Sequence, residues 1–258
     1  MKISFKNLKY IFLLGYYFIL PFLGLTQDLL PDGIGNYWVI SGSKVSKIDA
    51  KGQTIAHYSN ILLGNPSSLD SSDPFRVMVF YNQNQNILFL NNDAAIIGKP
   101  INFVDIGLGE VVLSCRSSLG GIWLLHREKA ELLRYNNQFN AVEQRISIGD
   151  EFKNYDPKQM TEHGGILYIS LNKSIIARFD TYGAQLIPLD ILHEGYFRIE
   201  ANYLWVKHNN LFWKYNLNDL NEHPETYRCS CHSIPLTINK AVACFNGKEF
   251  IFCEKVIP

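Results

Sequence analysis

Residues Gly165–Ile187, GILYISLNKSIIARFDTYGAQLI, decide the fold of this chain. The stretch predicts two short strands and the start of a third, with the polar turn Leu171–Lys173 between the first two. A second turn follows at Asp180–Gly183, because an Asp side chain caps its own turn and Gly accepts a positive φ. The same order of strands and turns recurs along the chain, which indicates a repeat protein.

Two markers give the period of this repeat. In the first, an Asp or Asn follows the apolar end of a strand, with steps of 42, 45, 44 and 36 residues between Asp49, Asn91, Asn136, Asp180 and Asn216. In the second, a bulky residue lies in the preceding strand, with steps of 41, 44, 45, 37 and 45 residues between Trp38, Val79, Trp123, Tyr168, Trp205 and Phe250. A unit of about 44 residues with several strands is typical of a β-propeller blade. The strands of an irregular β-sandwich are not copies of one unit, so two markers with the same period are not expected there.

We therefore predict an all-β protein, a β-propeller with blades of about 44 residues. The length of residues 27–258 favours five blades, and six is the alternative because Phe250 marks a sixth unit. The two C-terminal strands are expected to pair with early strands near Trp38 and Val45. In that arrangement the N- and C-terminal strands close the ring within one blade and leave no free edge.

Two segments resemble the strand-turn-strand core of NHL-type propeller repeats. They are SKVSKIDAKGQTI, with Ile48, Asp49 and Gly52, and KSIIARFDTYGAQLI, with Phe179, Asp180 and Gly183. These triplets match the hydrophobic–Asp–x–x–Gly turn of that family. The other units carry Ala94, Phe139 and Asp219 in place of the glycine. The resemblance implies a fold and no particular activity.

The N-terminal segment, residues 1–26, has the pattern of a secretory signal peptide. Three lysines precede an apolar run that ends at Leu25, and small residues precede Gln27. We expect cleavage after Thr26, which leaves residues 27–258 as one exported propeller domain in the periplasm, at the outer-membrane periphery or outside the cell. An uncleaved anchor is the alternative, although Pro21 interrupts the run and the run is short for a membrane span.

Charge and length restrict the partners of the exported domain. Without the leader's three lysines, the chain keeps 21 of its 24 basic side chains against 24 acidic ones. This balance argues against a nucleic-acid partner. No segment after the leader is long and apolar enough to cross a bilayer, so any peripheral membrane association is expected to go through a partner.

The five cysteines are Cys115, Cys229, Cys231, Cys244 and Cys253. An exported chain can form disulfides, and Cys244 and Cys253 are candidates because they fall on two adjacent antiparallel strands. We expect one disulfide among the last four cysteines and an unpaired core residue at Cys115. The run Cys229–His232 has no second ligand pair, so we predict no metal site.

Candidate binding residues lie in the loops. The loops that join blades are expected on one face, together with the turns between the middle strands of each blade. We predict an acidic partner-binding face formed by Asp70, Asp73, Asp156, Glu194, Glu222 and Glu225. The middle turns add Arg127, Lys173 and His208. A face with one sign of charge concentrates partners of the opposite sign, whereas ordinary loops are simply solvated.

Three functions fit these observations. The fold resembles the propeller accessory subunits of outer-membrane assembly machineries, which implies a non-catalytic scaffold that binds an envelope protein and needs no cofactor. The alternative is a calcium-dependent hydrolase of the lactonase and gluconolactonase type, with Glu162, Asn172 and Glu200 as candidate oxygen ligands. A third hypothesis is a propeller that binds glycans or peptides. The first is favoured because it requires no catalytic residue that the sequence lacks.

Overall fold

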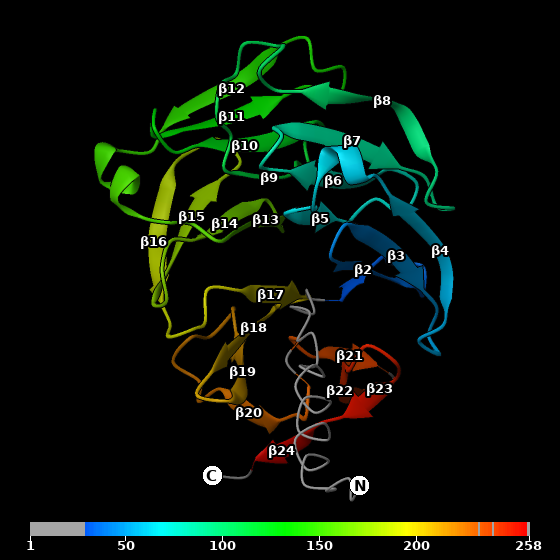
Figure 1. The fold of residues 1–258 in the computed structure, drawn as a ribbon. Helices are drawn as coiled ribbons and strands as arrows, with labels where there is room; N and C mark the ends of the chain where they lie inside the picture. The colour runs from blue at the N-terminus through cyan, green and yellow to red at the C-terminus, as the bar shows by residue number, and fades with distance from the viewer. Residues whose placement is uncertain (1–28, 232, 239, 257–258) are drawn as a thin grey trace, which may run out of the picture.

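The computed structural model describes residues 29–231, 233–238 and 240–256. Within these residues it is an all-β ring of six sheets (Figure 1). The predicted signal peptide lies outside the described residues. Among the residues described, no helix has the length and apolar character to cross a membrane.

The first three blades each contain four consecutive antiparallel strands. Blade 1 consists of β1 (Leu30–Pro31), β2 (Tyr37–Ser41), β3 (Lys44–Ile48) and β4 (Thr54–Ser59). Blade 2 consists of β5 (Ser68–Asp70), β6 (Val77–Tyr81), β7 (Asn86–Leu90) and β8 (Ile96–Asn102). Blade 3 consists of β9 (Leu113–Arg116), β10 (Ile122–His126), β11 (Glu131–Tyr135) and β12 (Val142–Ser147).

The last three blades contain four, five and three strands. Blade 4 consists of β13 (Gln159–His163), β14 (Ile166–Ser170), β15 (Ile175–Asp180) and β16 (Gln185–Asp190). Blade 5 consists of β17 (Phe197–Glu200), β18 (Tyr203–His208), β19 (Leu211–Asn216), β20 (Glu225–Arg228) and β24 (Glu254–Val256). Blade 6 consists of β21 (Leu236–Ile238), β22 (Ala241–Phe245) and β23 (Phe250–Phe252). Two 3-10 helices, η1 (Ile61–Leu63) and η2 (Asp150–Asn154), lie in loops between blades.

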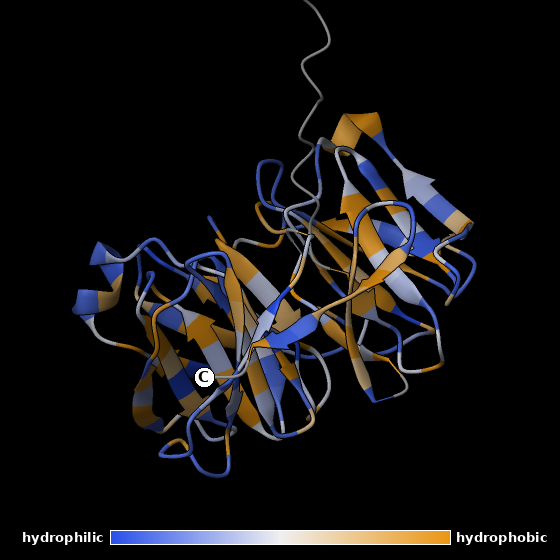
Figure 2. Cartoon of the chain, turned by 90° about the horizontal axis from the view of Figure 1, so that it is seen from below, coloured by the Kyte–Doolittle hydropathy of each residue, from blue (hydrophilic) through white to orange (hydrophobic). Residues whose placement is uncertain are grey.

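The two sequence markers lie on the second and third strands of the blades. Trp38, Trp123 and Trp205 are fully buried on second strands, where they pack between blades. Asp180 follows the end of a third strand as predicted, and its Oδ1 accepts hydrogen bonds from Tyr182 N (2.9 Å) and Ala184 N (2.8 Å). Hydrophobic residues concentrate in the strands, whereas the loops are mainly hydrophilic (Figure 2).

Antiparallel order gives the ring two distinct faces. The blade-joining loops and the turns between second and third strands lie on one face, which we call the linker face. The turns between first and second strands and those between third and outer strands lie on the opposite face, which we call the turn face. This assignment follows from the strand order, because successive antiparallel strands alternate in direction.

Polar links join the innermost strands of neighbouring blades. Gln159 exchanges two hydrogen bonds with the backbone of Phe197 (2.9 and 2.8 Å), which ties blade 4 to blade 5. Similar links join Ser71 to Pro31 O, Asp70 to Arg116 N, Glu162 to Ser118 N and Glu200 to Thr237 N. These links cover the five junctions from blade 1 to blade 6, and the innermost strands are therefore fixed to one another around the ring.

The number of blades and the closure of the ring differ from the favoured predictions. The ring has six blades, the alternative number, and Phe250 lies on the third strand of blade 6, so Ala243 takes the place of the bulky marker on β22. No described C-terminal strand pairs with blade 1, so the prediction of closure by shared strands is wrong. Blades 1 and 6 instead meet through side chains, among them the ring pair Tyr37 and Phe250, whose centroids are 5.2 Å apart.

The predicted disulfide between Cys244 and Cys253 is also wrong. Cys229 is bonded to Cys253 and Cys231 to Cys244, while Cys115 is free and buried as expected. Cys253 N donates to Val242 O, so Cys253 lies opposite Val242 and diagonal to Cys244. A diagonal pair on neighbouring strands is farther apart than a directly opposed pair. Cys229 and Cys231, which follow β20, are the partners of Cys253 and Cys244, respectively.

Gly52 lies at the contact between blades 1 and 6. Its φ is +82°, and a Cβ there would lie 2.7 Å from Lys248 O and 2.9 Å from Phe245 Cε2. We expect Gly52→Ala to lower the free energy of unfolding by about 3 kcal/mol, because it adds overpacking to backbone strain. Gly42→Ala is the matched control, since Gly42 has φ +57° and a Cβ added there would have no heavy atom within 4 Å.

Urea unfolding of both variants measures these changes, with about 1 kcal/mol expected for the control from strain alone. Equal losses in Gly52→Ala and Gly42→Ala would show that the close contact of blades 1 and 6 does not exist.

Candidate functional site

The six predicted acidic residues do not share one face. Asp156 and Glu194 lie in blade-joining loops, on the linker face as expected. Asp70 ends the innermost strand β5, and Asp73 follows it in a turn of the turn face. Glu222 lies in the turn between β19 and β20, and Glu225 begins the outer strand β20.

Each of the six acids has a partner within the fold. Asp70 accepts a hydrogen bond from Arg116 N (2.9 Å), and Asp73 lies 3.3 Å from the guanidinium of the same arginine. Glu222 accepts a hydrogen bond from Asn216 Nδ2 (2.9 Å) across its own turn. Each carboxylate therefore supports a local structural contact.

Glu225 is the centre of a polar network that fastens the C-terminal strand. Its carboxylate contacts Lys214 Nζ (3.1 Å), Tyr227 Oη (2.8 Å) and Lys255 Nζ, and Lys255 belongs to β24. Burial raises the pKa of the Glu225 carboxyl, but the hydrogen bonds from Lys255, Tyr227 and Lys214 outweigh burial and lower the pKa to about 2. The carboxylate is thus charged at neutral pH and holds β24 against β20.

This lowered pKa predicts an acid-sensitive contribution to stability. The contribution is complete above the ordinary glutamate pKa of 4.5 and is lost as the pH falls toward about 2, because the unfolded chain takes up the proton first. Urea unfolding of the native chain and of Glu225→Gln at several pH values isolates it. The stability difference between the two should shrink over this window, and a constant difference would contradict the network.

A cleft of about 440 Å³ opens on the linker face beside blade 4. Three segments form it: the loop from blade 3 to blade 4, the turn between β14 and β15, and the loop from blade 4 to blade 5. The residues that line it are Asn154, Tyr155, Asp156, Lys158, Leu171, Asn172, Lys173, Glu194 and Gly195. Its volume falls within the usual range of small ligand sites. Asp156, Lys173 and Glu194 are predicted from the sequence as partner-binding residues, but the sequence does not predict that they share a cleft.

The charges in this cleft are not predominantly acidic. Asp156 pairs with Lys158 and with Arg127 (3.5 Å), a predicted middle-turn residue. Glu194 pairs with Lys207 (3.1 Å). Lys173, by contrast, makes no ion pair with any residue that the structure describes.

Asn172 and Lys173 each provide a hydrogen-bond donor at the cleft. The Asn172 Oδ1 atom accepts hydrogen bonds from Ser174 N and Ile175 N (both 2.8 Å). The amide nitrogen of Asn172 can therefore donate to another partner. Together with the ammonium group of Lys173, this favours an anionic group in the cleft. His208, the third middle-turn residue, lies at the end of β18 in blade 5, outside the cleft lining.

A serine and a histidine that precede the cleft residues Leu171 and Glu194 in sequence are in direct contact. Ser170 Oγ lies 2.9 Å from His193 Nε2, and His193 Nδ1 lies 2.7 Å from Ile191 O. Because a carbonyl oxygen accepts only, Nδ1 carries the proton and Nε2 accepts from the serine. Burial lowers the pKa of His193, against the opposing effect of the Ile191 hydrogen bond, so the imidazole is neutral.

No pattern in the sequence predicts this pair, because its members are 23 residues apart on a strand and a loop. Both side chains are fully buried, at 0% and 1% exposure, and the third group is a backbone carbonyl instead of a carboxylate. In this geometry the pair fixes the loop to β14, and neither side chain is exposed to solvent.

The three candidate calcium ligands do not converge. Glu162 accepts hydrogen bonds from Ser118 N (3.1 Å) and Trp123 Nε1 (2.6 Å), so both of its oxygens bind neighbouring groups. Glu200 accepts from Thr237 in blade 6. Asn172 lies on the linker face, whereas the two glutamates lie at the other ends of innermost strands, near the turn face.

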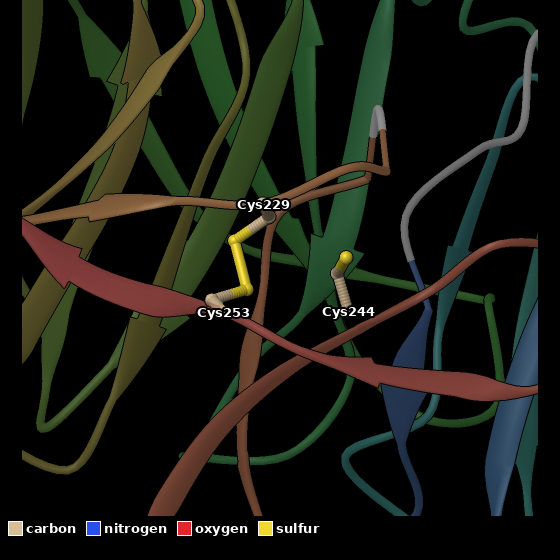
Figure 3. A group of neighbouring side chains, drawn as sticks. All are labelled: Cys229, Cys244 and Cys253. Atoms are coloured by element: carbon tan, nitrogen blue, oxygen red, sulfur yellow. A yellow bond between two sulfur atoms is a disulfide. The ribbon is translucent and has the colours of Figure 1, made fainter.

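Among the described residues, His, Cys, Asp and Glu side chains form one cluster of three potential metal ligands. All three ligand atoms are cysteine sulfurs. The Sγ atoms of Cys229, Cys244 and Cys253 lie within 4.8 Å of one another (Figure 3). All three belong to disulfides, so none is a thiolate that can bind a metal in this state.

No protein-family model matches this chain, and no curated protein matches it. Several solved structures do match this chain. A streptogramin B lyase superposes with a TM-score of 0.60 at 11% identity, covering 90% of this chain and 93% of that chain. Virginiamycin B lyase from Staphylococcus aureus gives 0.58 at 13% identity, covering 90% and 80%. A protein of unknown function from Bacteroides caccae gives 0.56 at 10% identity, covering 86% and 94%.

These lyases are β-propellers, and this chain shares their architecture. It is a six-bladed β-propeller. At identities of 10–13% the likeness concerns the fold alone, and the reactions of the two lyases are properties of those proteins.

Proposed function

We propose that this propeller is exported and acts as a non-catalytic scaffold or accessory subunit at the cell envelope. It binds an envelope protein through the linker face, in the periplasm, at the outer-membrane periphery or outside the cell. The observation that carries the proposal is the cleft beside blade 4, where Lys173 is unpaired within the described residues while the nearby acids are neutralised. We infer that the partner presents a carboxylate to this lysine.

Exposed apolar residues on the same face support a protein partner. Ile61 and Leu62 on η1 are 84% and 85% exposed, and Val104 in the next blade-joining loop is 61% exposed. Leu62 O accepts a hydrogen bond from Asn84 Nδ2 (3.4 Å), so η1 is tied to the turn between β6 and β7. Adjacent apolar side chains held in this way offer a partner surface that can be buried without reordering a loop.

The two disulfides support export. Disulfides persist in oxidising compartments and are rare in the cytosol, and here four of the five cysteines form them. The signal-like leader points to the same compartment.

The proposal includes neither a catalytic residue nor a cofactor. A lactonase-type site requires several oxygen ligands around one cation, and Glu162, Asn172 and Glu200 bind separate neighbours. A glycan-binding propeller requires exposed aromatic platforms, and the cleft contains one aromatic residue, Tyr155. Neither alternative has an observation in its favour as specific as Lys173, which has no ion pair among the residues that the structure describes.

Charge reversal at the cleft tests the partner. We expect Lys173→Glu to reduce recovery of a stoichiometric envelope protein from native membranes by about tenfold, since a repelled carboxylate costs at least about 1.4 kcal/mol. Lys51→Glu is the matched control, because Lys51 is also exposed in a turn and also has no ion pair among the described residues, but lies on the turn face. Equal recovery with both variants, or recovery of the propeller alone, would contradict the proposal.

Export is tested separately by sequencing the N-terminus of the protein purified from the organism's envelope fraction. We expect the mature chain to begin at Gln27. A chain that keeps Met1 and remains in the cytosol would show that the leader is not a signal peptide.

A further inference from the structure

The last four cysteines connect blade 6 to blade 5. Cys229 follows β20 of blade 5, and its partner Cys253 lies between β23 of blade 6 and β24, which returns to blade 5. Cys231 lies in the segment that leads to blade 6, and its partner Cys244 lies on β22. The C-terminal strand therefore crosses from one blade to the next, and a disulfide holds it at the crossing.

The two disulfides lie side by side. The Cys244 sulfur lies within 4.8 Å of the sulfurs of Cys229 and Cys253. Figure 3 shows the Cys244 side chain beside the Cys229–Cys253 disulfide. This separation is small enough for a rotation of one cysteine side chain to bring a freed thiolate into contact with the neighbouring disulfide. Exchange requires that contact, because a thiolate attacks a disulfide sulfur directly.

The two disulfides differ in exposure. Cys229 and Cys253 are half-buried, whereas Cys231 and Cys244 are 7% and 1% exposed. An external thiol can therefore reach the first disulfide, and the second is shielded by the fold. Access to the attacked sulfur is one of the factors that set the rate of exchange.

We propose that the Cys229–Cys253 disulfide is an exchange site for an external dithiol oxidoreductase, and that Cys244 transmits the exchange to the buried disulfide. This inference goes beyond the scaffold function and does not depend on the identity of the envelope partner.

The chemistry balances in three steps. A thiolate of the dithiol protein attacks the Cys229–Cys253 bond, forms a mixed disulfide with one cysteine and releases the other as a thiolate. The second thiol of the dithiol protein then breaks the mixed disulfide, so that protein leaves oxidised and the propeller holds two more thiols. Finally, the thiolate of Cys229 or Cys253 attacks Cys244 and displaces Cys231 as a thiolate, with no net change in oxidation state.

Exchange changes how the C-terminal strand is held. With the Cys229–Cys253 bond open, β24 keeps its pairing with β20 and the contact between Lys255 and Glu225. Blade 6 has three described strands, and the Cys229–Cys253 bond fixes the chain where it returns from blade 6 to blade 5. The exchange site therefore controls how firmly this crossing is held.

Cys115 provides an internal reference for the assay. It is free, fully buried in blade 3 and far along the chain from the cluster. Burial raises the pKa of its thiol well above the ordinary value, so it does not take part in exchange in the folded protein.

Graded reduction of the mature chain with dithiothreitol, used as the dithiol probe, tests the proposal. Acid quenching and alkylation in denaturant, followed by peptide mapping, locate the thiols in chains that have lost one disulfide. We expect label on Cys231 together with Cys229 or Cys253, besides Cys115. Label confined to Cys229 and Cys253 would refute transmission through Cys244, and first labelling of the Cys231–Cys244 pair would refute the exchange site.

Two variants sharpen the test, and the first needs no reductant. Cys253→Ser leaves a free thiol at Cys229, and without added dithiothreitol we expect label to be shared between Cys229 and Cys231, besides Cys115. The control Cys231→Ser/Cys244→Ser removes the buried disulfide, and its reduction with dithiothreitol should expose Cys229 and Cys253, besides Cys115. If folded Cys253→Ser, checked by circular dichroism, carries label at Cys229 and Cys115 only, the proposal is wrong.

Discussion

The contact between the first and last blades is the constraint on which the ring depends. A four-stranded sheet of this size cannot bury both of its faces, so each blade is stable only between two neighbours. At the junction of blades 1 and 6 no described strand is shared, and an apolar cluster containing Leu29, Ile48, Leu236 and Phe245 takes its place. The buried guanidinium of Arg198 adds hydrogen bonds to carbonyls on both sides, at Leu29 O and at Ile234 O (2.9 Å).

The same constraint explains the C-terminal crossing. Blade 6 has three described strands, so it offers its neighbours less surface than the others do. The chain compensates by returning to blade 5, where β24 extends the ladder beside β20 and Lys255 meets Glu225. Two disulfides at the crossing restrict the unfolded chain and secure the smallest blade. Packing of side chains between blades 1 and 6 thus replaces closure by a shared sheet, and the disulfides secure blade 6 to blade 5.

The periodic parts of the sequence predict the fold well. Second and third strands carry long apolar side chains, and the third strands end in Asx turns. The spacing of these features therefore reveals the blades, and Asp180 makes the backbone contacts expected of such a turn. The innermost strands leave no comparable signal, because β1 has two residues and β5 has three. Because antiparallel strands alternate in direction, each missed strand moves the next loop to the opposite face of the ring in the prediction. Without β5, Asp70 and Asp73 are assigned to the wrong face.

The site is less predictable than the fold for a related reason. The cleft is formed by three segments that are separate in sequence, and its charge depends on which ion pairs form across them. The sequence places Asp156 and Glu194 on the linker face, as the structure does. It does not predict their ion pairs with Arg127 and Lys207, because these depend on how separate segments meet. Cysteine pairing has the same limit, since four cysteines allow three pairings and sequence spacing does not choose among them.

The crossing of the C-terminal strand also determines how the ring carries mechanical load. Tension applied at the C-terminus passes through Cys253 into Cys229 and so into blade 5, before it reaches the short hydrogen-bonded ladder of blade 6. In an assembly that tethers the protein by this end, the pull is borne by a covalent bond to the five-stranded blade. The three-stranded sheet of blade 6 is thereby protected from being unzipped strand by strand.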